Sequence, residues 1–139
     1  MILKTLLSLM AFQYIGTPYI WAGNNYDGLD CSGLVLKSLH DVGVTLPDMT
    51  AQTIYNWALS KKFESCEPSA DCLLFFGGSD KHLTHVAIAL DEKYMIEAAG
   101  AGRNSLTMSK KDLARIDARV RIKPITNRGD LIASIKIKY

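Results

Sequence analysis

The sequence predicts one α+β domain in which N-terminal helices pack on an antiparallel sheet of about five strands. The first half of the chain carries apolar residues at helical spacing, whereas the second half carries short apolar runs separated by turns. Helices first and strands later are typical of a domain whose helices cover a face of an antiparallel sheet. The 139 residues are 48% hydrophobic, which is enough for one buried core, so we assign residues 1–139 to a single domain.

The expected helices have the apolar spacing or the capping residues of helices. They are Leu3–Gln13, Cys31–Val42, Thr50–Leu59 and Ser109–Ile116. The second follows a Gly/Pro-rich loop and is expected to stop at Gly43. The third is expected to be capped near Asp48 or Thr50, and the fourth by Ser109 or a neighbour.

The expected strands are short runs rich in β-branched or aromatic residues. They are Leu73–Phe76, His85–Leu90, Tyr94–Ala99, Arg119–Pro124 and Leu131–Lys138. The second and third are joined by the turn Asp91-Glu92-Lys93, which predicts a β-hairpin. The segment KKDLARIDARVRIK mixes both signs of charge and is expected to form a solvated helix and strand.

The charge pattern and the N-terminal segment argue against several classes of protein. Basic and acidic residues are mixed and the net charge is only +2, so we expect no nucleic-acid partner. Residues 1–16 contain a short apolar run like that of a signal peptide, but they lack an Ala-x-Ala cleavage site. The run is also shorter than the ~18 residues of a membrane span. We therefore expect a helix of the fold, no signal peptide, no membrane span and synthesis in the cytoplasm.

Cys31 is the first candidate for chemistry. The loop GTPYIWAGNNYDGLDCSG delivers its thiol to the first turn of a helix. There the helix dipole and unpaired N–H groups favour a thiolate, which is the form that acts as a nucleophile. A small buried hydrophobic side chain is the alternative interpretation of this cysteine.

A nucleophilic thiol needs a base, and His85 is the histidine best placed to be one. His40 lies nine residues after Cys31 in the same expected helix, which is too far along the axis for contact. His82 lies in a polar turn. His85 opens the apolar strand HVAIAL, so its ring is held rigidly and can still face a cleft.

Glu97 is the expected partner of His85. In a hairpin that turns near Glu92, the start of one strand faces the end of the other, which brings His85 and Glu97 together. A carboxylate in an otherwise apolar strand needs a partner to offset its desolvation. A charge on an edge strand that faces water is the alternative.

The segments GTPYIWAG, DGLDCSGLV, LLFFGG, HVAIAL and YMIEAAG, in this order, resemble the NlpC-type cell-wall peptidases of the papain-like cysteine peptidase superfamily. The resemblance runs from Leu6 to Gly102. It implies a papain-like fold and a catalytic domain that uses no cofactor or metal. It places the nucleophile on Cys31, the base on His85 and the third polar residue on Glu97.

The resemblance also implies roles for residues around the thiol. Tyr19 falls on the family's tyrosine beside the catalytic cysteine, and packing under the loop beside Trp21 is the alternative. Trp21, from the same YxW element, is placed among the substrate-binding residues. In members that cut beside a free amino terminus, the residues flanking the cysteine bind that amine, which implies this role for Asp30 and Ser32.

The implied function is hydrolysis of amide bonds in peptidoglycan stem peptides, with a thioester intermediate on Cys31. A thiol acyltransferase or deamidase-like amidohydrolase with a non-wall substrate is one alternative. A non-catalytic phage structural module is another. The chain also resembles phage-type members, so we expect it to reach the cell wall through a phage tail or another delivery partner.

Two features depart from the family pattern. Its usual proline-glycine-aspartate turn appears here as Ala70-Asp71-Cys72, and its commonest third residue, histidine, is replaced by Glu97. Cys66 and Cys72 are expected to be reduced thiols, with a disulfide as the alternative. The spacing of these cysteines from the histidines fits no common zinc site, so no metal is expected.

Overall fold

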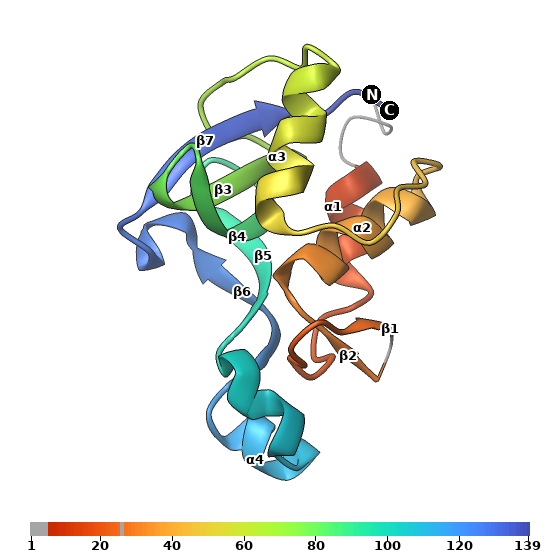
Figure 1. The fold of residues 1–139 in the computed structure, drawn as a ribbon, viewed down its shortest axis with the longest axis vertical. Helices are drawn as coiled ribbons and strands as arrows, with labels where there is room; N and C mark the ends of the chain where they lie inside the picture. Colours follow the sequence, from red (N-terminus) through yellow and green to blue (C-terminus); the bar gives the residue numbers. More distant parts are fainter. Residues whose placement is uncertain (1–5, 26) are drawn as a thin grey trace.

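The computed structural model describes residues 6–25 and 27–139, and it has the α+β architecture expected from the sequence (Figure 1). The helices are α1 (Leu6–Phe12), α2 (Cys31–Asp41), α3 (Ala51–Ser60) and α4 (Lys110–Arg115). The strands are β1 (Asn24–Asn25), β2 (Gly28–Leu29), β3 (Cys72–Ser79), β4 (His82–Ala89), β5 (Tyr94–Ala99), β6 (Arg119–Pro124) and β7 (Leu131–Lys136). Two 3₁₀ helices span Gly102–Thr107 and Ile125–Asn127.

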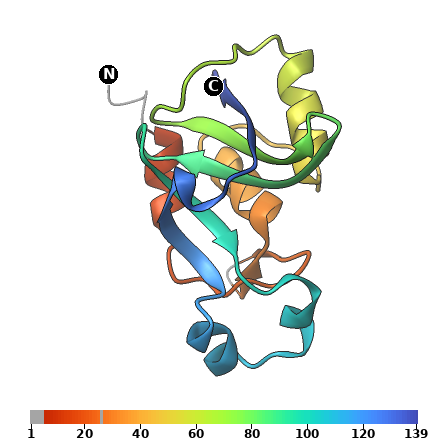
Figure 2. The ribbon, with the colours of Figure 1, turned by 90° about the vertical axis from the view of Figure 1, so that its left-hand side faces the viewer.

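The main sheet has five strands in the order β6-β5-β4-β3-β7, and all neighbouring strands are antiparallel. Helices α1, α2 and α3 lie on one side of it and contact β4, whereas α4 lies at one end of the molecule (Figure 1). Figure 2 views the molecule from the strand side. The fold class predicted from the sequence is therefore confirmed.

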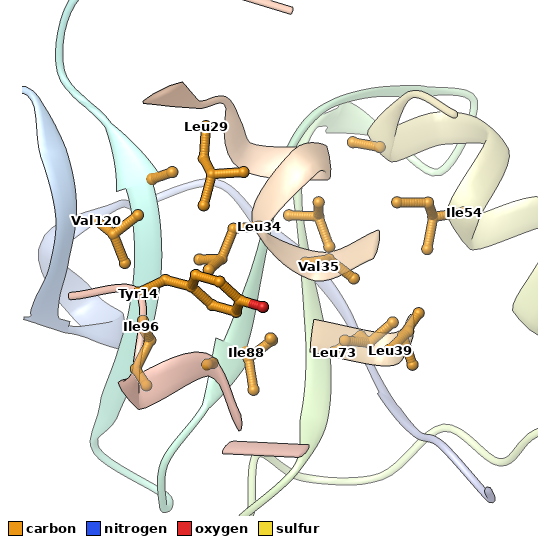
Figure 3. Close-up of a cluster of buried hydrophobic side chains, with 14 of the residues drawn as sticks. Tyr14, Leu29, Leu34, Val35, Leu39, Ile54, Leu73, Ile88, Ile96 and Val120 are labelled. Carbon is orange, nitrogen blue, oxygen red and sulfur yellow. The ribbon is translucent and has the colours of Figure 1, made fainter. Parts of the chain in front are cut away.

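The core lies between this sheet and the helices (Figure 3). Leu34 and Leu39 of α2 are fully buried, as are the sheet residues Ile88 and Ile96 that belong to the same cluster. Truncation of such a leucine to alanine typically costs about 2–5 kcal/mol. This packing fixes α2, and so the position of its first residue, relative to β4 and β5.

The turn that departs from the family pattern has a structural role. Asp71 has a φ of +72°, a left-handed conformation that aspartate tolerates better than most side chains. Its buried carboxylate accepts hydrogen bonds from the backbone N–H groups of Leu7 and Ser8, at 3.3 and 2.9 Å, and from the Tyr139 hydroxyl at 2.6 Å. Asp71 therefore ties the start of α1 to the sheet.

The predicted helices and strands are present, with differences at their ends. Part of the first predicted helix, residues 3–5, lies outside the described residues. Thr50 caps α3 and Ser109 caps α4. Strands β3 and β4 run further toward each other than predicted, because Gly77 continues the pairing through a bulge. A Cβ at Gly77 would lie 2.2 Å from the His82 carbonyl oxygen, so only glycine permits this approach.

Cys66 and Cys72 lie next to each other at the start of β3. Both are free thiols, with their Sγ atoms 3.3 Å apart, and Cys66 is exposed whereas Cys72 is buried. The Ser69 hydroxyl lies 3.3 Å from the Cys72 sulfur. None of the helices in the described residues has the length and apolar content needed to cross a membrane.

Candidate active site

Cys31 is the first residue of α2, as the sequence predicted. The preceding residue, Asp30, is the N-cap: its Oδ1 accepts the Gly33 N–H at 2.6 Å and the Ser32 hydroxyl at 3.2 Å. A Cβ at Gly33 would lie 2.1 Å from the Gly23 carbonyl oxygen, so the loop backbone packs directly on the first helical turn. This packing holds the half-buried Cys31 thiol at the helix N-terminus.

His85 and Glu97 also meet, although not as a directly opposed pair. Strands β4 and β5 align Ile88 with Ile96 and Ala89 with Met95. Continued along the strands, this register makes His85 and Glu97 diagonal neighbours on one face, within reach of long side chains. The His85 Nε2 lies 2.8 Å from the Glu97 Oε1, and the residues are only 5% and 1% exposed.

The Cys31 side chain also interacts with the His85 ring, and this interaction raises the pKa of His85. Since Nε2 faces Glu97, Nδ1 is the ring nitrogen left for the thiol. Burial alone would lower the pKa of His85, but interactions with Cys31 and Glu97 outweigh it and raise that pKa. Cys31 and the hydrogen-bonded Glu97 thus both favour a charged His85 imidazolium.

Glu97 has a second partner, Arg121, which the sequence analysis did not select. The Arg121 Nε lies 3.0 Å from the Glu97 Oε2, and the two residues are directly opposite in β5 and β6. Burial raises the pKa of Glu97, but hydrogen bonds and charge from His85 and Arg121 hold it below its usual value. Arg121 lies in the segment that was interpreted as solvated, yet its side chain is only 15% exposed.

Arg121 was missed because its importance depends on strand pairing. The charge pattern of residues 110–123 carries no information on which strand they join. Its position opposite Glu97 follows only from the β5–β6 register, and about 20 residues of 3₁₀ helix, α4 and loop separate these strands. An opposite-charge cross-strand pair is the signal that could have found it.

A cleft of about 460 Å³ opens beside the thiol. Its lining includes the predicted residues Tyr19, Trp21, Asp30, Cys31 and Ser32. It also includes residues that the sequence analysis did not select, among them Asp48, Met49, Thr50, Leu83 and Thr84 from the α3 entry and β4. His85 and Glu97 are not among the residues that line the cleft.

Tyr19 is buried beside Cys31 in the cleft wall. Burial, together with the charges of Cys31 and Asp30, raises the pKa of Tyr19 to about 12. Its hydroxyl therefore stays protonated near neutral pH and is available as a donor. Trp21 is 40% exposed, its backbone N–H donates to the Ser105 hydroxyl at 2.7 Å, and the Arg103 guanidinium lies 5.2 Å from its ring centre.

Asp30 and Asp48 give the cleft an acidic wall. Burial raises the pKa of Asp30 despite the hydrogen bonds from Gly33 and Ser32, and the nearby Asp48 charge raises it further. A cationic group entering the cleft would relieve this repulsion. Within the described residues, no group of three or more His, Cys, Asp or Glu side chains is arranged to hold a metal ion.

Comparison with curated proteins finds relatives that carry endopeptidase names. The chain is 41% identical over 95 residues to the bifunctional muramidase/DL-endopeptidase CwlT of Bacillus subtilis. That match covers 66% of this chain but only 28% of CwlT. The chain therefore corresponds to a limited part of that longer protein.

Solved structures share the fold. The NlpC/p60 domain of the peptidoglycan hydrolase SagA has a TM-score of 0.66 at 23% identity, with 96% of this chain and 98% of that domain covered. RipD of Mycobacterium tuberculosis, described as a non-catalytic NlpC/p60 domain protein, has a TM-score of 0.68 at 17% identity, with 98% and 97% covered. The sequence pattern of the NlpC/P60 family matches residues 16–122, so this chain belongs to the NlpC/P60 family.

Proposed function

We propose that this chain is a cysteine peptidase that hydrolyses amide bonds in peptidoglycan stem peptides through Cys31, His85 and Glu97. The observation that carries the proposal is that the hydrogen-bonded His85–Glu97 pair lies beside Cys31, which starts α2 and lines a cleft. The peptidoglycan substrate is supported by family membership and by the name of the relative CwlT, a DL-endopeptidase.

In the proposed reaction, His85 accepts the Cys31 proton and the thiolate attacks the scissile carbonyl carbon. The first N–H groups of α2 have no acceptor within the helix, so the Cys31 N–H is a donor for the oxyanion. The Tyr19 hydroxyl, kept protonated by its raised pKa, is a second donor beside the thiol. The imidazolium then protonates the leaving amine, and water hydrolyses the thioester to regenerate Cys31.

We further propose that Asp30 and Ser32 bind a substrate ammonium group. The Asp30 Oδ1 accepts hydrogen bonds from Gly33 and Ser32, which fix the carboxylate at the cleft. The Asp48 charge on the same cleft supports a cationic ligand. Trp21, exposed at the cleft, supplies an apolar wall for the substrate. Delivery through a phage tail or another partner stays a prediction.

The proposal is tested by mass spectrometry of muropeptides incubated with the protein. Wild type is expected to split a stem peptide into two fragments whose summed mass exceeds that of the substrate by one water. Cys31→Ala is expected to lose activity by roughly a thousandfold or more while remaining folded. Cys66→Ala, which removes an exposed thiol that does not line the cleft, is the matched control and should retain full activity.

Other products would point to other functions. A fragment extended by an added amine would identify a thiol acyltransferase. Conversion of a side-chain amide to a carboxyl group, with water consumed, ammonia released and the peptide left uncut, would identify a deamidase. Wild-type protein that binds muropeptides from several wall types without cleaving them would contradict the peptidase. It would instead favour a binding module of the kind described for RipD.

A further inference from the structure

Glu97 is engaged on both of its oxygens, by groups from two different strands. Oε1 faces the His85 Nε2 at 2.8 Å, and Oε2 accepts from the Arg121 Nε at 3.0 Å. The carboxylate is therefore held in one plane between an imidazole and a guanidinium. With Glu97 1% exposed, water contributes almost nothing to its orientation.

Arg121 is itself held on its other side. Its Nη1 donates to the Asp117 carbonyl oxygen at 2.9 Å and lies 3.4 Å from the Asp117 Oδ2. Asp117 is more exposed and is shared with Arg119 and Lys123, at 2.6 and 3.4 Å. Most of the Asp117 charge is thus balanced by these outer cations, and Arg121 remains the buried cation that faces Glu97.

The balance between the Glu97 and Arg121 charges matters because both side chains lie in a poorly solvated region. An unbalanced carboxylate beside His85 would strongly stabilise the imidazolium. A guanidinium stays charged at all accessible pH values, so the Glu97–Arg121 pair carries no net charge. Such a pair can accept the His85 N–H bond without adding a full negative charge to the site.

We propose that Arg121 is a positioning residue that fixes and neutralises Glu97, so that the pair acts on His85 as an oriented, nearly neutral hydrogen-bond acceptor. This inference rests on the proposed function only for its effect on the reaction. A base that is too strongly stabilised as imidazolium is a weak acid toward the leaving amine. Arg121 keeps His85 in the range where it can both accept and return a proton.

The remaining charged groups around His85 do not provide this balance. Cys31 of α2 carries the proton that His85 exchanges. Asp130, which precedes β7, is close enough to interact with the His85 charge, but Arg128 forms ion pairs with it at 3.1 and 3.0 Å. Asp130 and Arg128 therefore largely cancel each other.

The test is an NMR titration of His85, which needs no substrate and does not depend on peptidase activity. Arg121→Met removes the charge at similar length and is expected to raise the pKa of His85, because Glu97 becomes unbalanced. Glu97→Gln removes the buried carboxylate between His85 and Arg121 and is expected to lower the pKa of His85. The double variant Glu97→Gln/Arg121→Met removes both charges and is expected to return it close to the wild-type value.

Two further variants separate the effect of charge from that of structure. Arg121→Lys keeps the charge, and its His85 pKa should stay near the wild-type value. Arg119→Met removes an exposed cation that contacts Asp117 but not Glu97, and it should leave the His85 pKa unchanged. On muropeptides, Arg121→Met is expected to lose about tenfold in kcat and to shift the alkaline limb of the pH profile upward.

The proposal is overturned if Arg121→Met folds and titrates like wild type. If Arg121→Met fails to fold, the Glu97→Gln/Arg121→Met variant still tests the proposal, because it leaves no unpaired buried charge. If its His85 titration then equals that of Glu97→Gln alone, Arg121 does not balance Glu97. Absence of muropeptide cleavage in wild type would contradict the peptidase but not this titration result.

Discussion

At the scale of single residues, the site depends on which protons stay in place. His85 is hydrogen-bonded to Glu97 and interacts with Cys31, and Tyr19 stands beside the thiol with a hydroxyl that resists ionisation. In the proposed reaction His85 exchanges a proton, Glu97 stays ionised and Tyr19 stays protonated. Burial and the neighbouring side chains shift the pKa of each group in the direction that this requires.

Tyr19→Phe tests whether this hydroxyl acts on the reaction or only packs. If it donates to the developing oxyanion, its removal should lower kcat about tenfold to a hundredfold, with KM nearly unchanged. The melting temperature should change little, because the ring remains in place. Steady-state kinetics on a muropeptide substrate checks this, and an unchanged kcat would leave Tyr19 with a packing role.

At the scale of elements, the site is built where three chain segments meet. The loop before α2 supplies Tyr19 and Asp30, α2 supplies the thiol, and the β4–β5 pair supplies His85 and Glu97. The loop is tied to the sheet by hydrogen bonds from the Tyr19 N–H to Ala118 and from the Gly16 N–H to Val120, at 3.0 and 2.9 Å. The strand that carries Arg121 therefore also supports the loop.

The cysteine pair at the start of β3 gives a prediction for this element. Disulfide exchange with oxidised glutathione is expected to join Cys66 to Cys72, releasing two glutathione thiols, because their sulfurs already lie 3.3 Å apart. Burial raises the pKa of the Cys72 thiol, but hydrogen bonds from Ser69 and Cys66 outweigh it and lower that pKa.

The measurement is made in the Cys31→Ala background, so that the site thiol does not react. Intact mass should fall by two hydrogens, and the melting temperature should rise by roughly 5 °C. Cys66→Ser is the control and should show neither change. A glutathione adduct that persists on Cys66 would contradict close approach of the two sulfurs.

At the scale of the whole molecule, the buried His85–Glu97 pair links stability to pH. The pKa of His85 is raised above its ordinary value of 6.5, so its contribution is fully present below that pH and is lost as pH rises through the folded pKa. The pKa of Glu97 is lowered below 4.5, so its contribution is present above that pH and is lost as pH falls through the folded pKa. The His85–Glu97 pair therefore stabilises the fold most between pH 4.5 and pH 6.5.

Urea unfolding of wild type and His85→Gln checks this linkage. The stability difference between the two proteins is expected to be greatest at about pH 6 and to shrink as the pH rises from about 6 to about 9.5. His40→Gln, at an exposed histidine of α2, is the control for replacing a histidine outside this pair. A constant difference across this range would mean that His85 is not stabilised in its charged form.

Local sequence patterns predicted the four helices, the five strands of the main sheet, and Cys31, His85 and Glu97 as the candidate reactive residues. Helical spacing and the Asp30 cap place Cys31 at a helix start, and a short turn makes one hairpin of the strands that carry His85 and Glu97. Family resemblance added Tyr19, Trp21, Asp30 and Ser32, which the structure places on one cleft.

The residues that join the site from distant parts of the chain depend on tertiary packing and could not be predicted from local patterns. Arg121 reaches Glu97 because β6 pairs with β5, and Asp48 joins the cleft because the segment before α3 packs beside the loop that carries Asp30. The physical reason is that pairing between distant strands is set by burial of the whole core, which a local pattern of charges does not encode. The same charged segment that looks solvated in sequence thus supplies the cation that balances the site.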